Sequence, residues 1–252
     1  MTWKPFALIA ALLAVTEAAV RLFDVPTYLV PAPSAVFAEL GMRWDYFVTH
    51  VPATTVEIWV GFAIALLAGI LLSLPIALTK FGEQALMPVL VATQSIPKTA
   101  LAPIFVIWFG FGLTPKITMA AVIAFFPIVV NMVLGLRSVD PEIVQYLRTV
   151  GASNWEIFRK LRLPSSLPYL LAGMKVSISL ATVGAIVGEF VGADQGLGFV
   201  ILRAINNFDT VTMFAALLVV SVLGVLSYGA VALLERRALS WAPDISTSQT
   251  GA

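Results

Sequence analysis

The chain has 252 residues, of which 60% are hydrophobic and 12% charged, with a net charge of +1 and a mean hydropathy of +0.96. Soluble domains are usually about 45–50% apolar with about a quarter of their residues charged, so this composition excludes an ordinary soluble domain and predicts an all-α membrane protein. The sequence has no cysteine and one histidine, His50, which excludes disulfides, thiolate catalysis and a histidine-rich metal site.

Apolar runs long enough to cross a bilayer, about 20 residues each, recur along the chain. They predict a single transmembrane domain over 1–252, a polytopic bundle of about six helices. The predicted spans are 6–23, 54–79, 85–112, 117–136, 167–191 and 210–234. The first run resembles a secretory signal, but Glu17 and the lack of a small-x-small cleavage site favour a retained helix. The polar segment 242–252 is predicted to be disordered.

The Lys and Arg residues predict the orientation, because cytoplasmic loops are enriched in them. With six spans and a cytoplasmic N-terminus, nine of the fifteen lie inside, four outside and two within spans, so both termini are expected to face the cytoplasm. The outside set is Arg21, Arg43, Lys116 and Arg203, and the two within spans are Lys98 and Lys175.

A long outer loop is predicted over 24–53. Within it, Ser34 is the expected N-cap of a short amphipathic helix that carries Glu39 in its early turns.

A long inner loop over 137–166 carries the strongest local signals. Asp140 is the expected N-cap of a first short helix, and Gly151 its left-handed C-cap. Ser153 is the expected N-cap of a second helix, with Glu156 as its capping-box partner. The loop either lies on anionic headgroups as an amphipathic surface segment or inserts its helix–Gly–helix elbow into a groove on a partner protein.

The spacing within this loop resembles the signature of the inner-membrane permease subunits of ABC importers. Gly151 is followed by nine residues and then by 161-LRLP-164, whereas the family's EAA is not kept at 145–147, and Glu142 lies one turn earlier. The likeness covers nearly the whole chain and points to the branch that serves nitrate, sulfonate, taurine and thiamine-precursor uptake. Further matching segments are 32-APSAVFAEL-40, 95-SIPKTALAPIFVIWFGFG-112 and 188-GEFVGADQGLGFVI-201.

The resemblance implies a type I ABC importer permease fold in the bacterial inner membrane. It implies a homodimeric pore, two ATPase subunits that bind ATP and Mg, and a periplasmic or lipid-anchored substrate-binding protein; this chain would be no enzyme, hold no cofactor and bind no nucleic acid. The loop would couple the pore to the ATPase. Its candidate coupling residues are Glu142, Tyr146, Arg148, Gly151, Ala152, Ser153, Trp155, Phe158, Leu163 and Pro164.

Polar residues inside the predicted spans are candidates for the translocation pathway, since charges in a membrane are costly and usually face the interior. Lys98 lies between Pro97 and Pro103, where the helix is expected to break; it faces the pore or pairs with a neighbour. The other candidates are Gln94, Asn131, Ser179 and Glu189, with helix packing or an interfacial position as the alternative for each.

The substrate expected from the resemblance and from Lys98 is a small anionic or aromatic solute such as a sulfonate, taurine or nitrate. A thiamine pyrimidine precursor or another neutral heterocycle is the alternative. Two other classes of membrane protein are alternatives to a permease. A membrane-embedded enzyme would need an acid–base constellation in its spans, and the predicted spans of this chain contain none. An ion-coupled secondary transporter would need inverted repeats and several intramembrane carboxylates, whereas this chain has only Glu17, Glu57 and Glu189 near its span ends.

Overall fold

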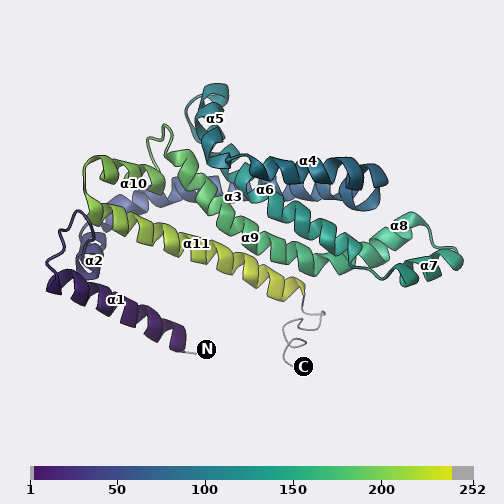
Figure 1. Cartoon of the computed structure of the whole chain (residues 1–252), viewed down its shortest axis with the longest axis horizontal. Coiled ribbons are helices and arrows are strands. Elements are labelled where there is room, and N and C mark those ends of the chain that lie inside the picture. Colours follow the sequence, from purple (N-terminus) through teal and green to yellow (C-terminus); the bar gives the residue numbers. More distant parts are fainter. Residues whose placement is uncertain (1–2, 240–252) are drawn as a thin grey trace. The chain divides into compact units, whose positions relative to one another are not determined.

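The computed structural model of the chain describes residues 3–239, which contain helices and no strand (Figure 1). The predicted disordered tail at 242–252 lies outside these residues. In chain order the elements are α1 Lys4–Leu22, α2 Pro33–Met42, α3 Trp44–Leu78, the π-helical turn η1 Gly82–Leu86, α4 Met87–Ala92, the 3-10 turns η2 Thr93–Ser95 and η3 Lys98–Leu101, α5 Ala102–Phe109, α6 Leu113–Arg137, α7 Pro141–Thr149, α8 Asn154–Ile157, the π-helical turn η4 Phe158–Arg162, α9 Leu163–Glu189, α10 Leu197–Asn206 and α11 Thr210–Ala238.

Five stretches of the described chain are long and apolar enough to cross a membrane. They are Lys4–Leu22, Trp44–Leu78, Leu113–Arg137, Asn154–Glu189 and Thr210–Ala238. A sixth span exists if Gly82–Ser95 and Lys98–Phe109, which are bent by 84° at their junction, are counted as one. The predicted all-α membrane fold is confirmed.

The bend in the predicted third span follows from its prolines. Ile96 has an extended backbone, with ψ of 124°, because the ring of Pro97 disfavours the helical conformation in the residue before it. The helix therefore stops at Ser95 and resumes at Lys98, which confirms the break expected around Lys98.

The chain divides into two compact units, and one of them is built around the start of α3. It comprises the described residues of Met1–Gly61, Thr99–Ala120 and Thr182–Gly224. Its core joins α2, α3, α10 and α11 through apolar side chains. The fully or largely buried members are Val36, Phe47, Val200, Ile201, Ala215 and Ala216.

The other unit carries the inner loop and comprises the described residues of Phe62–Lys98, Ala121–Ala181 and Val225–Ala252. Its core packs the end of α3 against α4 and the second half of α6. The buried members are Ile76, Ala77, Leu90, Val129, Met132, Val133 and Leu136, and Phe158 from η4 packs against them.

The predicted outer loop contains more helix than expected, and the prediction of Ser34 as a cap is wrong. The N-cap of α2 is Ala32, and Ser34 lies inside the helix. Its N–H and hydroxyl donate instead to Glu17, at 2.9 and 2.7 Å. A carboxylate from α1 thus satisfies the free N-terminus of α2, and α3 begins at Trp44, before the predicted span start at 54.

Candidate functional site

The inner loop folds as an elbow whose first arm is α7. Asp140 caps this helix by accepting a hydrogen bond from the Glu142 N–H at 2.8 Å. At the other end Gly151 adopts a positive φ of 86°, its N–H donates to the Arg148 carbonyl, and the Ala152 N–H donates to the Leu147 carbonyl. These two bonds form a Schellman motif, so both predicted caps are confirmed.

The second arm is also capped as predicted. The Ser153 hydroxyl accepts from the Glu156 N–H at 3.2 Å, and the Glu156 carboxylate accepts from the Ser153 N–H at 3.0 Å. The arm is not a separate short helix, however, because α8, η4 and α9 form one stretch, Asn154–Glu189. The π-helical turn η4 precedes Pro164, whose ring would clash with the carbonyl four residues earlier in a regular α-helix.

Aromatic side chains are exposed on both arms of the elbow. Tyr146 on α7 is 65% exposed and Trp155 on α8 is 66% exposed. Trp155 stacks on Phe158, with ring centroids 5.6 Å apart, and Phe158 packs against the buried core of the same unit. The exposed Trp155 is therefore connected to the interior of the unit through the ring of Phe158.

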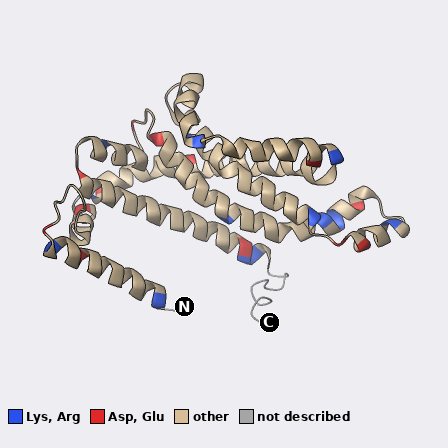
Figure 2. Cartoon of the chain, in the orientation of Figure 1, with Lys and Arg blue, Asp and Glu red and all other residues tan. Residues whose placement is uncertain are grey.

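The remaining candidate coupling residues lie elsewhere in the same loop and at the start of α9. Glu142 is exposed, Arg148 donates to Asn154 at 3.4 Å, and Leu163 and Pro164 form the first turn of α9. Figure 2 shows basic residues gathered between α8 and α9, where η4 carries Arg159, Lys160 and Arg162.

Two of the candidate pathway residues lie at the bend. Gln94 is exposed in η2, and Lys98 is partly exposed at the start of η3. The Lys98 ammonium donates to the Gln94 side-chain oxygen and lies 5.8 Å from the centroid of the Phe126 ring. The two residues are thus brought together, and the lysine interacts with an amide and an aromatic ring.

The side chains of Asn131 and Ser179 form hydrogen bonds within their own helices. The Asn131 amide donates to the Pro127 carbonyl one turn earlier in α6, at 2.8 Å, and the α9 backbone at Gly173 lies against its side chain. Ser179 is exposed and donates to the Lys175 carbonyl at 3.2 Å. Asn131 therefore lies in a helix–helix contact between α6 and α9.

Glu189 is fully buried at the end of α9. Its carboxylate accepts hydrogen bonds from the Thr54 hydroxyl at 2.6 Å, from the Gly198 N–H and from the Phe199 N–H at 3.2 Å. The last two are unpaired donors of the first turn of α10. Glu189 thus caps α10 from another helix, as Glu17 caps α2.

Gly196 makes this cap possible. Its φ is 115°, and a β-carbon on it would lie 2.3 Å from the Glu189 carboxyl carbon. Any larger residue would displace the carboxylate from the start of α10.

A second buried carboxylate, Glu57, lies one turn after Thr54 on α3 and was not anticipated. Its Oε1 lies 3.2 Å from the ammonium of Lys116 on α6, and both side chains are at most 3% exposed. Lys116 was expected in an outer loop, and that expectation is wrong. A carboxylate in an apolar helix needs a buried partner, and this is the signal that could have indicated a pairing, although the sequence alone does not identify the partner.

Residues 44–240 match the family described as "Binding-protein-dependent transport system inner membrane component". The chain belongs to this family. It is therefore a permease subunit of a binding-protein-dependent ABC importer, and the family is a membrane component rather than a catalytic one.

Curated relatives of the permease match over most of their length. This chain is 38% identical to the formylaminopyrimidine transport permease protein ThiX of Halalkalibacterium halodurans, over 94% of this chain and 95% of the relative. The chain is 37% identical to the riboflavin transport system permease protein RibX of Chloroflexus aurantiacus, over 91% of this chain and 87% of the relative. Identity to the putative aliphatic sulfonates transport permease protein SsuC of Bacillus subtilis is 30%, over 94% and 87%.

A solved structure shares the fold. In the inward-facing MetNI methionine ABC transporter, one chain matches with a TM-score of 0.66 and 22% identity, over 79% of this chain and 98% of that chain. Together with the family match, this confirms the type I ABC importer permease fold implied by the resemblance.

Proposed function

We propose that the permease forms half of the translocation pore for a small, flat nitrogen heterocycle of the pyrimidine or flavin type. The observation that supports this is the ordering of its relatives. Permeases named for a formylaminopyrimidine and for riboflavin are 38% and 37% identical to this chain, against 30% for one named for aliphatic sulfonates. A neutral heterocycle, which the sequence offers as the alternative substrate class, is thereby the leading candidate.

A small anion such as a sulfonate, taurine or nitrate is the second candidate. Lys98, at the broken span, was the residue that favoured it. Its ammonium contacts Gln94 and lies over Phe126, so its charge is partly engaged within its own unit. We keep Gln94 and Lys98 as proposed pathway residues, with polar and cation–π contacts to a heterocycle as their role.

The substrate class is tested on the cognate substrate-binding protein, because that subunit selects the substrate in such importers. Calorimetric titration with a formylated aminopyrimidine, riboflavin, taurine and nitrate compares the two classes directly. We expect saturable binding of a heterocycle. Uptake of the labelled ligand into proteoliposomes that contain the permease and its ATPase then has to require ATP; binding of taurine or nitrate alone would reject the heterocycle.

We also propose that the elbow is the surface that docks on the ATPase. Its two arms are fixed by caps at Asp140, Gly151 and Ser153, and it exposes Tyr146 and Trp155. Fixed helices that present aromatic side chains suit insertion into a groove. Two ATPase subunits, which would hold ATP and Mg, and a second copy of the permease complete the proposed assembly.

The proposed orientation has both termini in the cytoplasm of a bacterial cell, with the elbow on the same side. It rests on the basic residues of the inner loop and of the end of α11, and on the positive-inside rule. The substrate-binding protein would then dock on the opposite face.

A further inference from the structure

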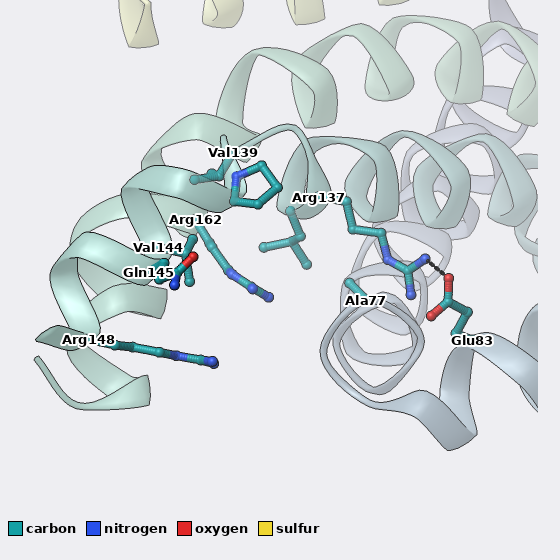
Figure 3. A pocket seen from close by; sticks show the side chains of 10 residues that line it. Ala77, Glu83, Arg137, Val139, Val144, Gln145, Arg148 and Arg162 are labelled. Carbon is teal, nitrogen blue, oxygen red and sulfur yellow. Dashed lines mark hydrogen bonds and ion pairs between the residues drawn. The ribbon is translucent and has the colours of Figure 1, made fainter.

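The unit that carries the elbow contains a cavity of about 490 Å³ behind α7 (Figure 3). Its walls come from the end of α3, from η1, from the end of α6, from α7 and from η4. Three arginines line it: Arg137, Arg148 and Arg162. In Figure 3 the side chains of Arg148 and Arg162 extend from the α7 side into the space that faces Ala77 and Glu83.

The cationic charge in this cavity exceeds the anionic charge. Arg137 is engaged by Glu83 at 2.6 Å and by the Ile76 carbonyl at 2.7 Å. Arg148 makes one long contact, to the neutral amide of Asn154 at 3.4 Å. Arg162 has no ion pair among the described residues, and Glu83 is the one acid in the lining. Two guanidinium groups therefore face the cavity without an acidic partner.

Two of the three arginines lie next to the long apolar helices α6 and α9. Arg137 is the last residue of α6, and Arg162 directly precedes α9. Residues at such positions lie at the depth of the lipid headgroups. The rest of the lining is largely apolar and includes Leu136, Val139 and Val144. The cavity therefore combines arginine side chains with apolar side chains that suit the glycerol or acyl segment of a lipid.

We propose that this cavity binds a phosphate oxyanion supplied by the headgroup of an anionic phospholipid. Guanidinium groups match phosphate geometry, because each can donate two parallel N–H bonds to two oxygens of one phosphate. Basic pockets between helices at the membrane surface are the known form of such lipid sites. Since α7 forms one wall and the end of α6 another, the bound headgroup would hold the first arm of the elbow against the membrane end of the unit.

The test measures lipid bound to the assembled transporter. The complex of the permease with its ATPase is purified, exchanged into detergent and titrated with phosphatidylglycerol or phosphatidylcholine, and bound lipid is counted by native mass spectrometry. We expect the wild type to retain phosphatidylglycerol in preference to phosphatidylcholine. Arg162→Gln and Arg148→Gln should each weaken that binding roughly tenfold or more, as for loss of a charged hydrogen bond.

The matched control removes the same charge nearby. Arg159→Gln and Lys160→Gln alter exposed cations of the same turn, η4, that do not line the cavity, and should leave phosphatidylglycerol binding unchanged. If both pairs of variants lose phosphatidylglycerol binding equally, the binding depends on the general surface charge and the proposal is overturned.

Two further outcomes would also overturn it. If inorganic phosphate binds the lipid-free complex with the same dependence on Arg148 and Arg162, the ligand is a soluble anion. If Arg162→Gln releases the ATPase while phosphatidylglycerol binding persists, the cavity belongs to the docking surface for that subunit.

Discussion

The Lys116 ammonium lies 3.2 Å from Glu57 Oε1, and both side chains are almost completely shielded from solvent. Neither Glu57 oxygen has a hydrogen bond within the described residues, and Lys116 is the cation paired with it there. Thr54, one turn earlier, donates to the second buried carboxylate, Glu189. One lysine therefore serves a region that holds two acids.

Lys116→Met should be strongly destabilising. Removal of one partner leaves a buried charge without compensation, which typically costs about 3–5 kcal/mol. Thermal unfolding in detergent measures the loss. Lys175→Met is the control, because its pair with Glu235 at 2.7 Å is about a quarter exposed and such pairs contribute about 1 kcal/mol or less.

A double variant keeps this prediction testable if Lys116→Met does not fold. Glu57→Gln with Lys116→Met removes both charges and should recover much of the lost stability. Equal destabilisation by Lys116→Met and Lys175→Met would show that the buried pair contributes no more to stability than the partly exposed pair.

The elbow was predictable because its signals are local. Asp140, Gly151 and Ser153 act on backbone groups within a few residues, and all three adopt the expected cap. The sequence therefore predicts the shape of the inner loop. Its continuity with α9 escaped prediction, because the span was predicted to start at 167, whereas the π-helical turn η4 accommodates Pro164 and the helix continues through it.

The carboxylate contacts were not predictable in the same way. Glu57 and Lys116, or Glu17 and Ser34, are far apart in sequence and meet only when helices pack. Ser34 illustrates the error, because a favourable cap residue was outcompeted by Pro33 at the first position and a distant carboxylate. Hydropathy gives the number of apolar runs, and packing decides which charges are paired.

Glu189→Ala should loosen the start of α10. The carboxylate accepts from the Gly198 and Phe199 N–H groups and from Thr54, and hydrogen bonds to charged groups contribute about 1.5–3 kcal/mol each. Hydrogen exchange followed by mass spectrometry should show amide exchange at least about tenfold faster over 197–200.

Asp194→Asn is the control for Glu189, because that side chain is exposed in the loop before α10 and its change should leave exchange unaltered. Loss of transport in Glu189→Ala with normal exchange would argue against a capping role and for the pathway role considered from the sequence.

Gly151→Ala and Gly229→Ala should have opposite effects on stability. Neither added β-carbon would meet an atom within 4 Å, but Gly151 has a φ of 86° and Gly229 lies inside α11. A β-carbon in the left-handed region costs about 1–2 kcal/mol, whereas alanine in a helix gains up to about 1 kcal/mol over glycine. Melting temperatures should fall for the first and hold or rise for the second; two changes of the same sign would contradict the cap.

Reporter fusions test the proposed topology at the bent span. If Gly82–Ser95 and Lys98–Phe109 form one crossing, the number of spans is six, and reporters near Lys4 and after Ala238 should both be cytoplasmic. A re-entrant pair would leave five spans and place the two reporters on opposite sides. A third fusion between α7 and α8 fixes the side of the elbow, which should match that of both ends.

Trp155→Ala tests the proposed docking surface. The side chain is 66% exposed, so its removal should change the stability of the permease little, while an aromatic anchor at an interface typically contributes about 2 kcal/mol or more, roughly 30-fold in affinity. The affinity of the ATPase for the permease is measured in nanodiscs, together with ATP hydrolysis stimulated by the loaded binding protein.

Trp108→Ala is the matched control, since Trp108 is 69% exposed but lies on α5, away from the elbow in sequence. Trp155→Ala should lower both readouts and Trp108→Ala neither; normal stimulated hydrolysis in Trp155→Ala would refute the assignment of the elbow as the coupling surface.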